Sequence, residues 1–309
     1  MNLREWALPV YTILMQLATG MLLILWLLRS TILKQTAADV VDKILRKPVA
    51  IALITVAAAL VGSHFHLSNP WISFLAVMNL GRSWLSREVF FSVLSLLGTA
   101  MLVYLTWVHP GERPRIKFWL GWAVVALGAA TIFSMSRCYL LPTQPAWNHP
   151  TTMALFFCSA LILGAVSVFT ILVMDAIFSR DYEPDLAEER DAILKWAGRR
   201  LVWVALIVAA AIMAMNIGRV LEMRAAPEDA MAQAALALQL ELYRLLFDLR
   251  FVTLIIGTGM FALVVHWLTA QKKTLDQLVT PAYVTCLLIL MAEILGRFLF
   301  YAAHVRLGT

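Results

Sequence analysis

Two residues suited to proton transfer stand at the ends of neighbouring apolar runs. His66 closes one run in the string HLSNP, and Glu88 opens the next run in LSREV. A histidine titrates near neutral pH and can accept a proton, which a carboxylate with a way out to water can carry on. Between apolar walls, such a pair suits the oxidation of a quinol, which gives up two electrons and two protons. Simpler interpretations stay open, since His66 could only cap its helix and the helix dipole already favours Glu88.

The last apolar run carries a second group of ionisable residues. In AEILGRFLFYAAH, Glu293, Arg297 and Tyr301 stand at i, i+4 and i+8, so they stack along one face of a helix. A buried pair of Glu293 and Arg297 has a structural interpretation, because an unpaired charge at that depth is costly. The functional alternative is a ladder that conducts protons or orients groups in a nearby pocket.

Other polar residues cluster on the same side of the apolar runs. Arg82 and Arg137 could tune the pKa values of the histidine and the carboxylate, and Tyr139 lies in a proline-broken loop that could roof a pocket. Gln16 is an uncharged amide inside the first run. We predict that His66 and Glu88 are the catalytic residues of a quinol-oxidising site. The candidate quinol-binding or proton-path residues are Gln16, Arg82, Arg137, Tyr139, Glu293, Arg297 and Tyr301.

The elements that position these residues are membrane-spanning helices. The protein has 309 residues, 61% of them hydrophobic and 14% charged, with a mean hydropathy of +0.80. This composition excludes a soluble enzyme, and the net charge of +6 therefore records membrane topology and not nucleic-acid binding. We predict an all-α integral membrane protein with eight transmembrane helices, one domain over 1–309, arranged as two four-helix groups. The apolar runs cover 6–28, 49–66, 88–108, 116–135, 151–178, 201–217, 251–268 and 281–301.

The distribution of basic residues predicts the orientation. More than half of the 25 lysines and arginines fall in the loops after the first, third, fifth and seventh runs. Basic loops face the cytoplasm, so both termini are expected on the periplasmic side. The periplasmic segment 219–250 is rich in helix formers and contains a helix start at Pro227, Glu228 and Asp229. It is either an interfacial helix or a docking helix for an extrinsic subunit.

The sequence gives no indication that this protein itself binds a cofactor. Cys138, Cys158 and Cys286 lack the spacing of a metal or cluster site, and we expect them to be small apolar fillers. The first alternative is a haem-b-type quinone anchor of another respiratory oxidoreductase. Such an anchor needs paired histidines in the membrane interior, whereas the histidines of this sequence lie near the ends of the apolar runs. A secondary transporter, the second alternative, usually shows two related halves with broken helices, and neither is visible.

The sequence resembles the membrane-anchor subunits of bacterial dimethyl sulfoxide reductases, which lie in the inner (cytoplasmic) membrane. The resemblance rests on REWALPVYTILMQ, HLSNP, LSRE and AEILGRFLFYAAH, and it covers nearly the whole length. It implies a haem-free anchor that oxidises menaquinol. It also implies periplasmic partners: an iron-sulfur subunit with four-iron clusters that receives the electrons, and a catalytic subunit that holds a molybdenum bis-pterin cofactor. His66 and Glu88 match the quinol-site histidine and the essential carboxylate of the family.

The sequence departs from the family pattern in two places, and the resemblance also has a consequence for charge movement across the membrane. Arg82 is placed differently from the family pattern, and the loop 180–200 is longer than the family core needs, so we expect it to be a solvated connector. If quinol oxidation releases protons at the same outer face where the reductase consumes them, turnover is non-electrogenic.

Overall fold

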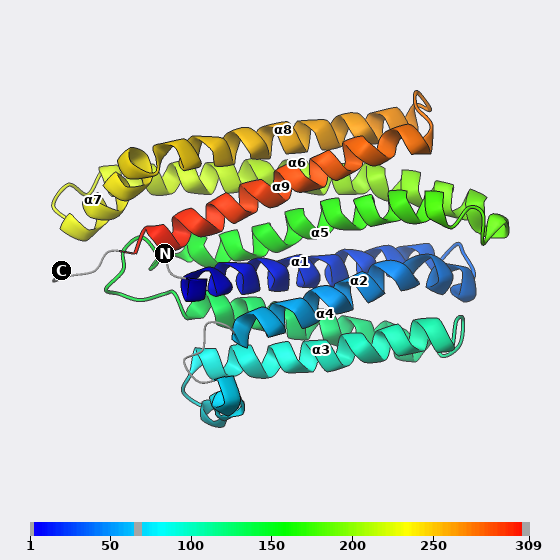
Figure 1. The fold of residues 1–309 in the computed structure, drawn as a ribbon, viewed down its shortest axis with the longest axis horizontal. Coiled ribbons are helices and arrows are strands. Elements are labelled where there is room, and N and C mark those ends of the chain that lie inside the picture. Colours follow the sequence, from blue (N-terminus) through cyan, green and yellow to red (C-terminus); the bar gives the residue numbers. More distant parts are fainter. Residues whose placement is uncertain (1–2, 65–69, 305–309) are drawn as a thin grey trace.

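Long apolar runs form helices because a helix satisfies its own backbone polar groups without water. The computed structural model describes residues 3–64 and 70–304, with side chains placed for 7–64 and 75–304. Eight helices in these ranges are long and apolar enough to cross a membrane, which confirms the predicted fold class. Figure 1 shows them as an elongated bundle. They are α1 (Leu3–Ile32), α2 (Ala38–His64), α3 (Trp84–Val108), α4 (Pro114–Arg137), α5 (Pro150–Phe178), α6 (Ala187–Arg224), α8 (Arg244–Thr269) and α9 (Leu275–Ala302).

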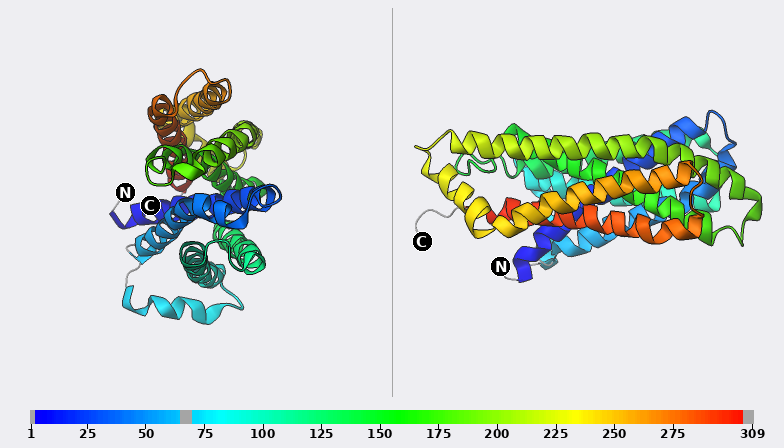
Figure 2. Two further views of the ribbon diagram at one scale, coloured as in Figure 1. Left: turned by 90° about the vertical axis from the view of Figure 1, so that its right-hand side faces the viewer. Right: turned by 90° about the horizontal axis from the view of Figure 1, so that it is seen from above.

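The helices form two groups of four. Helices α1 to α4 make one group, and α5, α6, α8 and α9 make the other (Figures 1 and 2). The groups meet where α1 packs against α5. There a Cβ atom added to Gly164 would clash with the backbone carbonyl group of Gly20, so the two backbones touch. Small residues that permit such close approach are a common means of helix association in membranes.

The beginning of α1 and the end of α9 lie at the same end of the bundle, which we call the terminal end (Figure 1). Three short elements also lie there: η1 (Pro70–Asn79), α7 (Ala230–Ala237) and the π-helical segment η3 (Leu238–Leu242). Asp229 caps α7, because its Oδ1 accepts hydrogen bonds from the backbone N–H groups of Met231 and Ala232, both at 3.0 Å. The expected helix start in the segment 219–250 is therefore present.

The loop 180–200 differs from the solvated connector that the sequence suggested. It contains the short helix η2 (Pro184–Leu186) and then the beginning of α6, which extends well before the apolar run. Arg190 is only 2% exposed. Glu183 and Arg190 are paired with residues of α2 and α5, which ties this segment to the bundle, whereas Asp181, Asp185, Glu188 and Glu189 are exposed.

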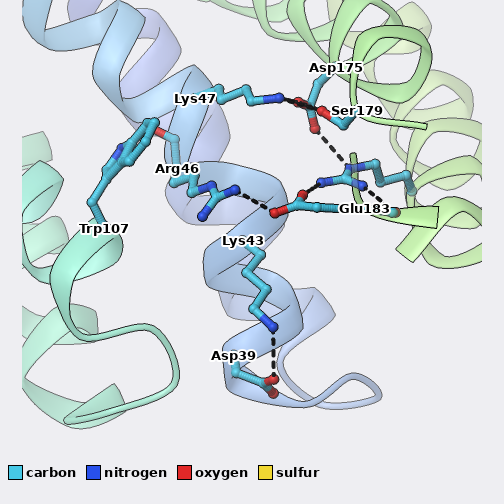
Figure 3. Close-up of polar contacts among 9 residues, drawn as sticks. Asp39, Lys43, Arg46, Lys47, Trp107, Asp175, Ser179 and Glu183 are labelled. Atoms are coloured by element: carbon cyan, nitrogen blue, oxygen red, sulfur yellow. Dashed lines mark hydrogen bonds and ion pairs between the residues drawn. The ribbon is translucent and has the colours of Figure 1, made fainter. Parts of the chain in front are cut away.

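Arg190 belongs to an ion cluster that joins α2, α5 and α6 at the end opposite the terminal end (Figure 3). Its Nε donates to Asp175 Oδ2 at 3.1 Å, and its Nη2 pairs with Glu183. Lys47 Nζ lies 2.7 Å from Asp175 Oδ1, and Arg46 Nη2 lies 2.5 Å from Glu183 Oε1. Each acid therefore faces two bases, which offsets the cost of removing these charges from water.

A second ion cluster at this end surrounds Asp42, which is completely buried. Arg29 Nη1 of α1 and Lys117 Nζ of α4 each lie 2.5 Å from one of its carboxylate oxygens. The backbone N–H of Gly111 donates to the same carboxylate at 2.9 Å. Asp42 thus ties α2 to α1 and α4 and fixes the first group of helices.

Candidate functional site

A cavity of about 590 Å³ opens at the terminal end between α1, α2, α3 and the loop after α4. Most of the surface of its wall is apolar, and polar side chains from α1, α2, α3 and the loop after α4 interrupt it. This combination of apolar walls with a few convergent polar groups is typical of sites for small apolar ligands. The wall, which we call the α1–α3 cavity, consists of Leu8, Tyr11, Leu60, Ser63, His64, Ala76, Val77, Leu85, Glu88, Val89, Ser92, Val93, Cys138 and Tyr139.

Glu88 is the one carboxylate among the described residues of this wall. Ser83 begins α3 as its N-cap, with its side chain accepting from the Ser86 N–H at 3.3 Å, so Glu88 falls in the second turn. The carboxylate is 5% exposed. The Cys138 thiol faces Glu88 Oε2 at 3.7 Å, and the Tyr11 hydroxyl forms a hydrogen bond with the carboxylate. Glu88 is therefore held by groups from two other elements while it remains on the cavity wall.

The loop after α4 contributes the other polar side of the cavity. Burial, followed by the nearby Glu88 carboxylate, raises the pKa of the Cys138 thiol to about 12, so the thiol stays protonated and donates. Burial, followed by the nearby Tyr301 and Glu88, raises the pKa of Tyr139 well above its ordinary value. The Tyr139 and Tyr301 hydroxyls lie 2.7 Å apart. Tyr139 thus roofs the cavity as a neutral phenol, as its loop position suggested.

Three further candidates, Gln16, Glu293 and Arg297, do not line this cavity. Arg297 Nη2 donates to Gln16 Oε1 at 2.8 Å, and its guanidinium carbon lies 3.8 Å from the centre of the Phe156 ring. Glu293 Oε2 accepts from Ser159 Oγ at 2.5 Å. Glu293 and Arg297 share a helix face, yet no ion pair within 4.0 Å joins them among the described contacts. The simple buried pair suggested by their spacing is therefore not what the structure contains.

The remaining candidates lie elsewhere. Arg82 and Arg137 are exposed and are not part of the cavity wall. The guanidinium carbon of Arg137 lies 5.1 Å from the centre of the Trp84 ring. His66 lies outside the described residues. The structure thus brings Glu88 and Tyr139 to one cavity, connects Tyr301 to Tyr139, and places the two arginines away from it.

Among the polar residues of the cavity wall, sequence reasoning missed Tyr11, Ser63, His64, Ser92 and Cys138. Tyr11 lies in α1, far from Glu88 in sequence, and no local pattern reveals that the two meet. Cys138 is no apolar filler, since its thiol faces the carboxylate. His64 lines the cavity, and its Nδ1 lies 2.8 Å from the Leu60 carbonyl oxygen. The sequence offered one indication that His64 belongs to the site, which is its position two residues before His66.

Among the described residues, no group of three or more histidine, cysteine, aspartate or glutamate side chains is arranged to hold a metal ion. The described histidines lie at or near the ends of helices, at His64, His109, His149, His266 and His304. His149, for example, caps α5, with its ring nitrogen accepting from the Thr151 N–H at 3.2 Å.

Comparison with known proteins gives consistent matches over the whole length. The family model for the DMSO reductase anchor subunit (DmsC) matches residues 1–303. The protein is 25% identical to the anaerobic dimethyl sulfoxide reductase chain YnfH of Escherichia coli strain K12, covering 98% of this sequence and 96% of that protein. It is 24% identical, with the same coverage, to a second anaerobic dimethyl sulfoxide reductase subunit of the same organism.

Proposed function

The protein belongs to the DMSO reductase anchor subunit family, and from that premise we propose that it oxidises a quinol in the α1–α3 cavity. Membership makes it an inner-membrane anchor of a reductase complex with an iron-sulfur subunit and a catalytic subunit. The resemblance to the family makes menaquinol the proposed substrate. The electrons pass to the iron-sulfur clusters and then to the molybdenum bis-pterin cofactor of the partners, which we place on the periplasmic side.

The observation that carries the proposal is a buried carboxylate on the wall of a cavity whose surface is largely apolar. A quinol has an apolar tail and a ring whose two hydroxyl groups must lose their protons as the ring gives up two electrons. The aliphatic wall suits the ring and tail, and Glu88 can receive a ring proton. Tyr11 and Cys138 donate hydrogen bonds to that carboxylate and hold it in place.

His66 is the proposed base for the ring hydroxyl, and this assignment rests on the family resemblance. His64 is the alternative base, because it lines the cavity. Both follow the apolar part of α2, so the protein offers two histidines for one task. The two assignments make different predictions and can be separated by substitution.

The first experiment compares two routes of electron supply in the purified complex. We expect Glu88→Gln to lower quinol-driven reduction at least about a hundredfold, because a positioned acid or base contributes roughly 10²–10⁴ in rate. Reduction driven by a soluble dye, which feeds the extrinsic subunits directly, should stay unchanged. Glu112→Gln is the matched control, since Glu112 is 62% exposed in the loop between α3 and α4. Equal loss of dye-driven activity would make Glu88 an assembly residue and contradict the proposal.

The second experiment assigns the base. His66→Gln should abolish quinol-driven reduction, His64→Gln should leave most of it, and His109→Gln, on the opposite end of α3, should leave all of it. The reverse order between His66 and His64 would transfer the role to His64. Unchanged activity in both variants would show that no histidine of this segment accepts the proton.

The described residues give no support to either alternative function. A bis-histidine haem needs two imidazoles facing each other in the membrane interior. The histidines of the described ranges lie near helix ends instead. The transporter hypothesis gains no feature from the fold, because the spanning helices of the described ranges run unbroken across the apolar runs.

A further inference from the structure

A second and smaller chamber lies at the terminal end, in the other group of helices. Its volume is about 70 Å³, and it lies between the ends of α5, α6, α8 and α9. Its wall includes Arg250, Glu293 and Arg297 and shares no residue with the α1–α3 cavity. We call it the arginine chamber. Arg250 is not part of the α1–α3 cavity.

Three arginines line the chamber, and Arg219 is paired with Glu222 at 2.6 Å, whereas the other two guanidinium groups lack a close counter-ion. Arg250 is 7% exposed and Arg297 is 6% exposed. Within the ranges that the structure describes, no carboxylate oxygen lies within 4.0 Å of either group. Each Nε atom has no hydrogen-bond partner, and Oε1 of Glu293 has none either. Three charged residues of the chamber wall therefore each carry a buried polar atom without a protein partner.

The neutral partners of the two arginines do not balance their charge. Arg250 Nη1 donates to Asn216 Oδ1 at 2.8 Å, and Arg297 Nη2 donates to Gln16 Oε1 at 2.8 Å. Gly296 lets Arg250 lie against α9, because a Cβ atom there would stand 2.5 Å from Arg250 Nε. The fold thus makes room for a buried guanidinium group that it does not pair with an acid.

The surplus of charge is positive whatever the protonation state of Glu293. With Glu293 ionised, the two arginines leave one positive charge; with Glu293 protonated, they leave two. The N-terminus of α5 adds positive potential, because Thr151 and Thr152 in its first turn also line the chamber. An uncompensated buried charge is strongly unfavourable, so a negative ligand would stabilise this arrangement.

We propose that the arginine chamber binds a small monovalent inorganic anion such as chloride. The anion lies between Arg250 and Arg297, and water completes the hydrogen bonds to Glu293. One water needs roughly 10–15 Å³ of such space, so the chamber has room for a monatomic ion and a few waters. The proposal does not depend on quinol oxidation, because the chamber and the α1–α3 cavity are separate.

The test is a halide titration of the intact complex in detergent, first exchanged into potassium gluconate. Adding chloride or bromide should raise the thermal unfolding midpoint saturably by a few degrees, while further gluconate at equal ionic strength should not. Bromide soaked into crystals should give an anomalous peak between Arg250 and Arg297. A midpoint that does not respond to halide, with no bromide peak, would show that the chamber holds only water and would overturn the proposal.

Two variants of α8 sharpen the test. Arg250→Gln should abolish the halide response, while Arg244→Gln, an exposed arginine on the same helix, should keep it. A halide response that persists in Arg250→Gln would place the anion elsewhere and contradict the proposal. If Arg250→Gln does not fold, Arg250→Lys replaces it, because this variant keeps the charge and should weaken the halide response. The halide titration of the unchanged protein tests the proposal in either case.

Discussion

At the scale of the residue, Tyr11 makes a specific contribution to the candidate site. Its hydroxyl bonds to the Glu88 carboxylate, and Ser92 bonds to the same hydroxyl. We expect Tyr11→Phe to lower quinol-driven reduction by about tenfold or more, because a hydrogen bond to a charged group contributes roughly 1.5–3 kcal/mol. The rate with quinol, measured beside the dye-driven rate, checks this prediction.

Tyr104→Phe is the control for that experiment, since Tyr104 lies on α3 and is 52% exposed. It should leave both rates unchanged. An unaltered quinol-driven rate in Tyr11→Phe would show that Glu88 is positioned without the phenol. A fall in the dye-driven rate would instead indicate damage to the assembly of the complex.

Glu183 gives a prediction on pH at the opposite end of the bundle. Burial alone would raise its pKa, but the hydrogen bond from Arg190 and the charges of Arg46, Arg190 and Lys47 lower it below the ordinary value of 4.5. A carboxylate with a lowered pKa stabilises the fold fully above its unfolded pKa and loses this effect as the pH falls through its folded pKa. The thermal unfolding midpoint should therefore fall below about pH 4.5.

Glu183→Gln should lower the thermal unfolding midpoint at neutral pH. The midpoint of this variant should then fall less at acid pH than that of the unchanged protein. Glu189→Gln, an exposed residue of the same segment, should follow the unchanged protein at every pH. An acid profile of Glu183→Gln that matches the unchanged protein would show that other carboxylates account for the whole loss. Circular dichroism of the detergent-solubilised protein provides the measurement.

At the scale of the element, the contact between α1 and α5 joins the two groups of helices. In water the hydrophobic effect would drive such packing, but lipid tails are as apolar as the helices, so close backbone contact carries more of the association. Gly20 and Gly164 supply this contact. On the same helices, Gln16 and Ser159 add hydrogen bonds to Arg297 and Glu293 of α9.

Gly164→Ala is expected to weaken this packing strongly. The new Cβ atom would clash with the backbone of Gly20, and no flexible side chain can give way there. We expect less assembled complex in the membrane and a lower unfolding midpoint. Gly259→Ala on α8 meets no atom within 4 Å and should leave both unchanged. Normal assembly of Gly164→Ala would show that α1 and α5 can separate at little cost.

At the scale of the whole molecule, the sequence predicts the eight helices and their polar ends, because apolar runs and charges are local properties. Glu88 and Tyr139 were predicted for the same reason, as polar groups beside an apolar run. The contacts of Tyr11 and Arg250 could not be predicted, since their partners lie on helices distant in sequence. The pairing of Glu183 with α2 and of Arg190 with α5 could not be predicted either, because composition alone does not indicate partners that are distant in sequence.

The position of the α1–α3 cavity at one end of the bundle gives the last prediction. The cavity lies at the terminal end, and the distribution of basic residues predicts that this end faces the periplasm. Protons released from a quinol at Glu88 would leave on that side. If the proposed partners dock on that side, the reductase would take up protons there as it reduces its acceptor. The electrons would then stay on the same side of the membrane, and no net charge would cross it.

We therefore expect the complex to generate no membrane potential during turnover. In liposomes with menaquinol and acceptor, a voltage-sensitive dye should stay silent while the acceptor is consumed, and a potassium gradient with valinomycin should give the full dye response. A turnover-dependent potential in sealed liposomes would mean that protons and electrons separate across the bilayer. The quinol protons would then leave at the end that holds Asp42 and Asp175, and the proposed exit beside Glu88 would be wrong.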